Sequence, residues 1–298
     1  MRNSALWGRL FADNAATLDG VAWSGGSWTL PLTNLVDERI VSYPARCLIT
    51  GDGAADRAAA TFTLTFPQRV HVWSAYIENT LLPPRAVVRI EGNSKADWSG
   101  ANVDSGWFRW NTRQVKSMAL PWIAPNWWTG AATEAELTTY GRRLRFFTGE
   151  RPWSVRALRL TIDPRVVVPG HLDLGYLFLP QRRWLPPYNY ALGRGLEALP
   201  RDIVDETASG YRPVEPRRAR RKHSISYEVL TKDGAFDLFD TGMTSTLARP
   251  VLFVPEPKDP LLHFRQTFLG KFRDSLPKAQ QWEQMLWSSS LTIEEMMG

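Results

Sequence analysis

The stretch RALRLTIDPRVVVPGHLDLGYLFL, residues 156–179, decides the fold class of this chain. In its first half, the apolar residues Leu158, Leu160 and Ile162 alternate with polar or charged ones. A period of two places them on one face of a half-buried β-strand. The Asp-Pro pair at 163–164 ends that strand, because proline lacks an amide donor and restricts the residue before it. The first half therefore predicts one strand that buries a single face.

The second half repeats the pattern after a Pro-Gly turn at 169–170. Apolar or aromatic side chains again occupy every second position: Leu172, Leu174, Tyr176 and Phe178. The whole stretch thus predicts two strands joined by a turn. It contains no catalytic set, no metal-ligand spacing and no phosphate-binding loop, so it predicts scaffold rather than chemistry.

Similar strand patterns lie on the N-terminal side of this stretch. TFTLTF (61–66), VHVWSAYI (70–77) and AVVRIEG (86–92) are short segments, and turn-forming residues such as Pro83-Pro84 separate them. Short strands punctuated by Gly and Pro are typical of a sandwich or barrel. We therefore predict a mostly β chain whose main domain is a jelly-roll-like β-sandwich.

The composition favours the same fold class. The chain has 298 residues, enough for one large or two medium domains, and its 14 Trp and 21 Pro suit a turn-rich β-protein better than a helical bundle. No window approaches 18 uninterrupted apolar residues and the start lacks an apolar signal region, so we expect neither a membrane span nor a secretory signal. The single cysteine, Cys47, excludes an internal disulfide. We expect it to be a small buried residue of a protein assembled in a reducing cytosol.

The C-terminal third has a different character. Residues 185–222 are rich in Pro, Gly and charge and lack periodicity, which predicts an extended connector. The predicted organisation is a galactose-binding-like β-sandwich domain over 1–184, this connector, and a smaller β-rich assembly domain over 223–298. Residues 1–35 are an open question, because the strand-like SWTLPL (27–32) could pair with strands of the C-terminal domain instead.

Two helices are expected within this β-rich pattern. Thr133 and Glu136 have the spacing of a capping box, which predicts the start of a short helix within 132–145. A second helix is expected around 234–243.

Few residues suggest catalysis or metal binding. No GxSxG segment is present, and no two histidines have zinc-ligand spacing: His71, His171, His223 and His263. A glycan-degrading enzyme that uses two carboxylates stays an alternative, with Asp52 and Asp56 as candidates. However, their Gly- and Asp-rich segment GDGAADR is expected to be a solvated turn before the strand at 61–66. We predict no enzyme activity, no cofactor and no metal.

A basic run is the strongest charge feature. Six cations lie within eleven residues: Arg212, Arg217, Arg218, Arg220, Arg221 and Lys222. Such a run can contact phosphates, but aromatic residues for base stacking do not interleave with it and the net charge is only +6, so nucleic acid is not an expected partner. The other readings are a solvated connector, or a strap that docks on an acidic neighbouring subunit. We take these six residues as candidates for subunit contact.

A tryptophan-rich segment is the second candidate surface. Residues 97–128 contain six tryptophans amid Gly, Ser, Asn and Pro, which predicts long ordered loops. Most of these rings are expected to fill the core of such loops. An exposed ring can instead anchor a protein partner or stack on a sugar. The candidates for glycan or partner contact are Trp107, Trp110, Trp127 and Trp128.

Together, several segments resemble a known class of proteins. TNLVDERIVSYPARCLIT (33–50), the strands that follow it, and VRALRLTI…GHLDLGYLFL with the following WLPPYN are similar to a discoidin-like, galactose-binding-like jelly roll. RPVLFVPEPKDP (249–260) and the segment 268–296 are similar to a closing β-unit. This order resembles tail-tip or baseplate proteins of long-tailed bacteriophages and related tail-like particles. No residue matches the dedicated sugar-binding loops of such folds.

The resemblance implies a function. It predicts a structural virion protein of the phage tail that acts through subunit contacts, is assembled in the cytoplasm of the host bacterium, and carries out no catalysis. Its implied partners are other tail or baseplate proteins and further copies of itself. The alternative is a carbohydrate-binding protein that recognises a host-surface glycan through its Trp-rich loops.

Overall fold

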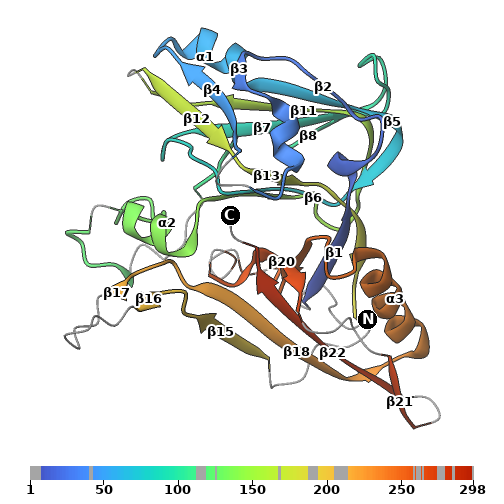
Figure 1. Ribbon diagram of the computed structural model, residues 1–298. Helices are drawn as coiled ribbons and strands as arrows, with labels where there is room; N and C mark the ends of the chain where they lie inside the picture. Colours follow the sequence, from blue (N-terminus) through green and yellow to red (C-terminus); the bar gives the residue numbers. More distant parts are fainter. Residues whose placement is uncertain are drawn as a thin grey trace. The chain divides into compact units, whose positions relative to one another are not determined.

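The structure, a computed structural model, consists of two compact units. The N-terminal unit comprises Asp13–Arg182, and the C-terminal unit comprises Met1–Ala12 together with Arg183–Met297. The structure describes residues 8–39, 43–111, 119–124, 126–166, 169–186, 194–204, 214–257, 259, 263, 265–273, 279–283 and 286–296. Both units are mostly β and are built from antiparallel sheets, which confirms the predicted fold class (Figure 1).

The N-terminal unit is a β-sandwich that contains one large sheet and two small ones. The large sheet has the order β2 (Ala22–Ser24), β5 (Thr61–Val72), β11 (Trp153–Asp163), β7 (Val87–Asn93), β8 (Asn102–Asp104), and β9 (Phe108–Arg109) also pairs with β7. One small sheet has the order β12 (Gly170–Leu174), β4 (Ala45–Ile49), β3 (Trp28–Leu30). The other has the order β10 (Arg143–Phe147), β6 (Ser74–Glu78), β13 (Tyr176–Phe178).

Strand β11 lies in the interior of the large sheet, between β5 and β7. Leu158, Leu160 and Ile162 are at most 1% exposed, as their alternation predicts, and the strand ends at Asp163 before the proline. Opposite Leu158 lies Gly92, where a Cβ would come within 2.6 Å of a side-chain carbon of a neighbouring strand. The close approach of β7 and β11 therefore requires glycine at this position.

The second half of the deciding stretch forms two strands rather than one. Strand β12 pairs with β4, whereas β13 pairs with β6, so the chain changes sheets at Gly175. All four alternating side chains are nevertheless buried, because both small sheets contribute to the core of the unit: Leu172, Leu174, Tyr176 and Phe178.

The local helix signals give two confirmed predictions and one correction. Helix α2 (Glu134–Tyr140) begins with the predicted capping box of Thr133 and Glu136, and α3 (Lys232–Ser245) covers the second predicted helix. The segment GDGAADR, expected to be a solvated turn, instead forms α1 (Gly53–Ala59). Asp52 caps this helix, while the buried Asp56 carboxylate accepts hydrogen bonds from the amides of Thr50 and Gly51 at 2.7 and 2.9 Å. Both candidate carboxylates are thus used to hold local backbone.

The C-terminal unit is built on one large antiparallel sheet. Its order is β14 (Pro180–Trp184), β1 (Arg9–Asn14), β19 (Val251–Val254), β20 (Phe268–Phe272), β22 (Leu286–Glu295), β18 (Arg220–Leu230), β15 (Gly195–Leu199), and β21 (Gln280–Glu283) also pairs with β22. Ala235 and Leu238 of α3 belong to the same core cluster as Ile225, Phe253 and Phe268 of the sheet. The helix therefore buries its apolar stripe against one face of the sheet.

The region predicted as an extended connector differs from that expectation. Within 185–222 the structure contains β15, the start of β18, and two short strands, β16 (Ile203–Val204) and β17 (Val214–Glu215). At the other end of the chain, Arg9–Phe11 pair with the C-terminal strand β19. SWTLPL does not join them, because Trp28–Leu30 pair with β4 of the N-terminal unit.

No helix of the described residues has the length and apolar character needed to cross a membrane. Short 3₁₀ segments complete the N-terminal unit: η2 (Ala15–Thr17) and η3 (Leu32–Val36).

Candidate functional site

Arg220, Arg221 and Lys222 of the basic run begin β18, and Arg217 and Arg218 lie just before it. Arg212 is outside the described residues. Side chains alternate along a strand, so Arg221 is buried while Arg220 and Lys222 are partly exposed. The neighbouring strand β22 ends in Glu294 and Glu295, and the register pairs Lys222 with Glu294. Strand pairing therefore places acidic side chains beside the basic run.

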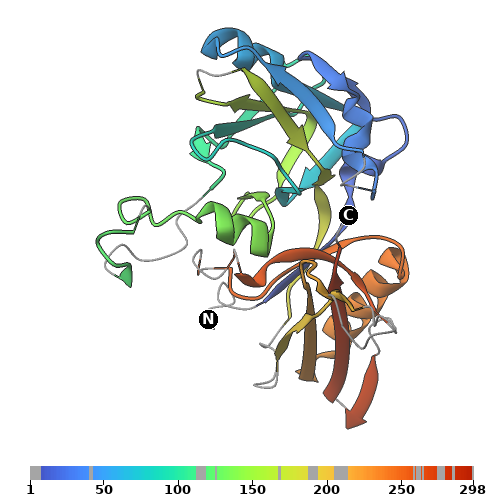
Figure 2. The same ribbon diagram turned by 60° about the vertical axis from the view of Figure 1, so that its left-hand side comes forward.

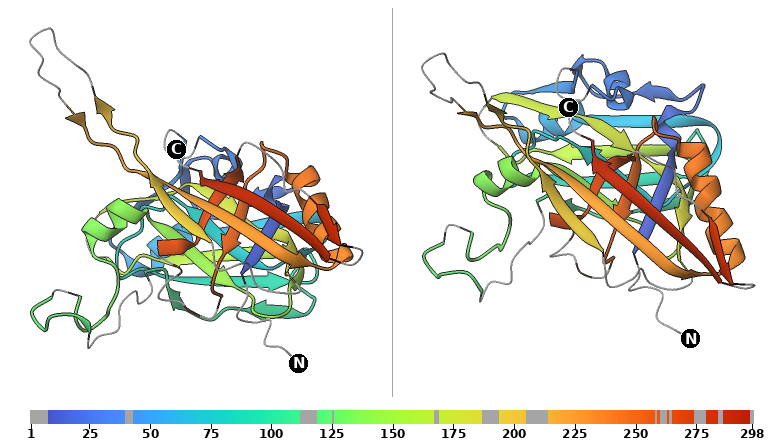
Figure 3. Two further views of the ribbon diagram at one scale, coloured as in Figure 1. Left: turned by 90° about the horizontal axis from the view of Figure 1, so that it is seen from below. Right: turned by 60° about the horizontal axis from the view of Figure 1, so that its bottom comes forward.

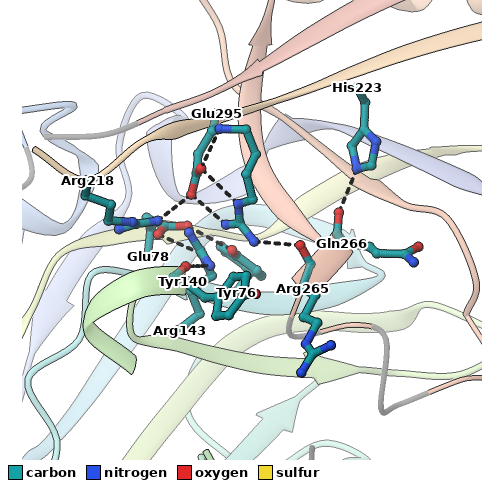
Figure 4. A network of polar contacts seen from close by, with 10 residues as sticks. Tyr76, Glu78, Tyr140, Arg143, Arg218, His223, Arg265, Gln266 and Glu295 are labelled. Carbon is teal, nitrogen blue, oxygen red and sulfur yellow. Dashed lines mark hydrogen bonds and ion pairs between the residues drawn. The ribbon is translucent and has the colours of Figure 1, made fainter. Parts of the chain in front are cut away.

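Glu295 is the centre of a buried charge network (Figure 4). The Arg221 guanidinium donates to both Glu295 carboxylate oxygens, at 2.9 Å from Nε and 2.6 Å from Nη2. Arg218 Nη2 also donates to Glu295, at 2.6 Å. Arg221 Nη1 donates to the Arg265 carbonyl at 2.8 Å. The Arg221 guanidinium is therefore held by both Glu295 and Arg265. Bidentate hydrogen bonds between an arginine and a carboxylate are strong, but here they are buried inside the unit.

The remaining described cations of the run also have acidic partners. Their ion pairs are Arg217–Glu215 at 3.0 Å, Arg220–Glu294 at 3.0 Å and Lys222–Glu197 at 2.5 Å. All of these groups belong to the C-terminal unit. The run is therefore largely neutralised within its own unit, and its role in subunit contact stays a prediction.

His223 lies on the same strand and is fully buried. Its Nε2 is 2.7 Å from the Gln266 carbonyl, and its ring stacks on Phe268 with a centroid distance of 4.8 Å. Burial lowers the pKa of His223 to about 4. This histidine is a neutral core residue.

The N-terminal unit also contains a buried carboxylate that pairs with an arginine, Glu78 (Figure 4). Arg143 Nε lies 2.8 Å from its carboxylate, and the Tyr76 hydroxyl donates to it at 2.8 Å. Burial raises the pKa of Tyr76 well above its usual range. Glu78 and Arg143 are register partners on β6 and β10, so this pair fastens two strands together.

Among the candidate tryptophans, Trp110 is a correction. It is only 2% exposed, and its Nε1 donates to the Pro83 carbonyl at 2.7 Å. It therefore holds the Pro-Pro turn and cannot offer a ring face to a ligand. Trp107 is 43% exposed, but the Arg57 guanidinium lies 5.8 Å from its ring centroid and covers part of it.

Among the described residues, the most exposed large apolar side chains lie between β9 and α2. Trp122, Ile123 and Trp128 are 82%, 85% and 83% exposed, and Figure 2 shows this segment extending away from the sheets of its unit. Trp127 is partly buried and meets the Trp128 ring edge to face, at 4.5 Å between centroids. Sequence reasoning did not single out Trp122 or Ile123, because their local composition resembles that of the buried Trp110.

The described residues contain neither a metal-binding cluster nor a reactive thiol. Within the described residues, no group of three or more His, Cys, Asp or Glu side chains could hold a metal ion. Cys47 is fully buried in β4, as expected, and burial raises the pKa of its thiol to about 11.

Comparisons with known proteins give little further information. No family model matches the chain, and no curated protein matches it. A solved structure described as "CpGH89CBM32-6 produced by Clostridium perfringens" is 10% identical, with 57% of this chain and 100% of that chain covered and a TM-score of 0.33. A likeness at this level carries no argument about fold or function.

Proposed function

We propose that this chain is a structural component of the tail tip or baseplate of a long-tailed bacteriophage, assembled in the host cytoplasm, and that it acts through contacts with other subunits rather than by catalysis. The assignment to a phage tail rests on the sequence resemblance across both units. The observation that carries the contact role is the ribbon formed by β16 and β17, which we call the arm.

The arm has the properties of an element that a partner completes. The pairing of β15 with β18 ends at Leu199 and Arg220. Beyond these two residues, the same chain segments form β16 and β17, which pair as a separate two-stranded sheet. Figure 3 shows the arm extending beyond the end of the sheet of its unit. A two-stranded ribbon alone is marginal in water and has unpaired edges that can accept another strand.

The side chains of the arm support this role. Ile203, Val204 and Val214 are 37%, 57% and 55% exposed, although β-branched apolar residues normally favour burial. Exposed apolar groups on a projecting element are typical of interaction surfaces. Polar contacts near its base, such as the Arg217 amide bonded to Asp202 at 2.8 Å, fix the path of the arm without covering its apolar side chains.

The test is incorporation into tail particles. Particles purified from cells that express the chain are analysed by mass spectrometry, and electron microscopy locates the chain. The double variant Val204→Asp and Val214→Asp should still fold, because both side chains are exposed, yet incorporation should fall strongly. Met243→Asp, 55% exposed on α3 of the same unit, is the matched control and should assemble normally. If the wild-type chain is absent from particles, the phage assignment fails.

Carbohydrate binding is a second candidate function, favoured by the exposed rings of Trp122 and Trp128. Indole faces stack on sugar rings because they offer a large flat apolar area together with one polar N–H. Titration with cell-surface polysaccharide, followed by tryptophan fluorescence, should give a saturable response that Trp128→Ala weakens. A flat response with the wild-type chain would eliminate this candidate.

A further inference from the structure

Three arginines of the N-terminal unit meet at one end of its large sheet. Val87, the first residue of β7, is the register partner of both Arg109 on β9 and Asp163, the last residue of β11. Arg85 lies just before Val87 in the chain, and Arg165 lies just after Asp163. The strand pairing therefore brings Arg85, Arg109 and Arg165 together, and all three line one cleft of 930 Å³.

The opposite wall of this cleft is held in place by side-chain hydrogen bonds. Asn126, Thr129 and residues 131–134 form it. Asn111, only 6% exposed, donates to the Ala132 carbonyl at 3.1 Å and accepts from the Ala132 amide at 3.2 Å. Asn126 donates to the Ala131 carbonyl at 2.8 Å. The cleft is therefore a formed feature of the unit, and a ligand would meet pre-organised walls.

The charge of the cleft is unbalanced. Among the described residues that line it, Glu134 is the only carboxylate, and it already pairs with Arg142. Arg165 has only a loose contact, 3.7 Å from Nε to the Asp163 carboxylate. In the part of the chain that the structure describes, no ion pair or hydrogen bond occupies the guanidinium of Arg85 or of Arg109. This contrasts with the basic run of the C-terminal unit, where each described cation has a partner.

We propose that this cleft binds a carboxylated saccharide. Unpaired guanidinium groups recognise carboxylates through paired N–H donors. The Asn126 amide and the Thr129 hydroxyl line the cleft, and the donor and acceptor positions that their local hydrogen bonds leave open suit sugar hydroxyls. The described lining has no large apolar side chain to anchor a peptide, so an acidic peptide fits it less well. The proposal deepens the second candidate function and does not depend on a role in a tail.

The test compares two probes on the same sugar skeleton. Isothermal titration calorimetry with the intact chain measures binding of oligogalacturonate and of its fully methyl-esterified form, in which every carboxylate is neutral. We expect the acid to bind at least about tenfold more tightly than the ester, with an affinity that falls as salt rises. The double variant Arg85→Gln and Arg109→Gln should lose that preference. Arg69→Gln with Arg156→Gln removes the same charge from exposed positions elsewhere in the unit and should keep it.

Each other outcome overturns the proposal in a distinct way. Equal binding of acid and ester would leave carbohydrate binding intact but refute recognition of the carboxylate. A polyglutamate peptide that binds as tightly as the saccharide would assign the cleft to acidic peptides. If neither the acid, the ester nor a neutral oligogalactoside binds, both the proposal and the second candidate function fail.

Discussion

The basic strand and the tryptophan-rich segment use their side chains in opposite ways. On β18 the long cationic side chains turn toward carboxylates of the same unit, and Arg221 and its partner Glu295 are both nearly inaccessible to solvent. In the segment 119–128 the apolar rings of Trp122 and Trp128 lie in solvent. Residue type alone would suggest the reverse, with arginine outside and tryptophan inside.

Strand pairing explains this difference. The basic strand lies next to β22, which supplies Glu294 and Glu295, so its charges are satisfied before any partner arrives. The described residues 119–124 and 126–129 of the tryptophan-rich segment form turns and bends rather than strands. Trp110 is buried where its indole N–H donates to the Pro83 carbonyl. The molecule thus has little free charge on β18 and considerable free apolar surface on the segment 119–128.

The largest expected effect concerns Trp110, the buried ring of the tryptophan-rich segment. Trp110→Ala should lower the free energy of unfolding by about 4 kcal/mol, because it empties a buried site and leaves the Pro83 carbonyl without its donor. Urea unfolding measures the loss, and hydrogen exchange should locate it in the N-terminal unit. Trp122→Ala is the control and should change stability by less than about 0.5 kcal/mol. A small loss for Trp110→Ala would mean that the burial of this ring and its hydrogen bond to Pro83 contribute little to folding.

The next effect tests the basic strand. Glu295→Gln should destabilise the C-terminal unit by about 3 kcal/mol, because it leaves the buried Arg221 charge without a counter-charge. Glu294→Gln removes a neighbouring carboxylate that is one fifth exposed and pairs with Arg220, so it should cost no more than about 1 kcal/mol. Thermal unfolding of the two variants gives the comparison. Equal losses would show that the position on the strand, rather than burial, sets the contribution of these ion pairs to stability.

Local signals allowed part of this arrangement to be predicted from the sequence. The alternation of Leu158 and Leu160 predicts a buried face, and the spacing of Thr133 and Glu136 predicts a capped helix, because each signal involves only neighbouring residues. The partners of the basic run could not be predicted, since Arg221 and Glu295 are 74 residues apart and meet only through strand pairing.

The tryptophans show the same limit. Trp110 and Trp128 lie in segments of similar composition, yet one is 2% exposed and the other 83%. What separates them is a hydrogen bond from Trp110 to a residue 27 positions earlier, which no local pattern encodes. The change of sheets at Gly175 is likewise invisible in the period of two, because both strands bury their apolar side chains.

A smaller effect comes from pH and concerns His223. Its pKa is about 4 in the folded chain against an ordinary 6.5, so the unfolded state binds the proton more readily. Stability from this group is therefore complete above about pH 6.5 and falls as the pH drops from there toward 4. Between pH 7 and pH 5 the loss should be about 2 kcal/mol.

The check is the slope of unfolding free energy against pH. His223→Phe removes the titrating group and keeps a flat ring to stack on Phe268, so the slope between pH 5 and 7 should flatten. If the slope persists in His223→Phe, it comes from another titrating group. His223 then contributes nothing to the pH dependence of stability.

The smallest effect on stability belongs to the exposed rings. Trp122→Ser combined with Trp128→Ser should change the free energy of unfolding by no more than about 0.5 kcal/mol, because both side chains stay more than 80% exposed in the folded chain. The same variant should lose part of the tryptophan fluorescence that iodide quenches in the native chain. If it instead loses more than about 1 kcal/mol, the rings contribute to folding and the contrast with the basic strand is wrong. If stability is unchanged while saccharide or subunit binding is lost, the free apolar surface serves recognition alone, as the contrast requires.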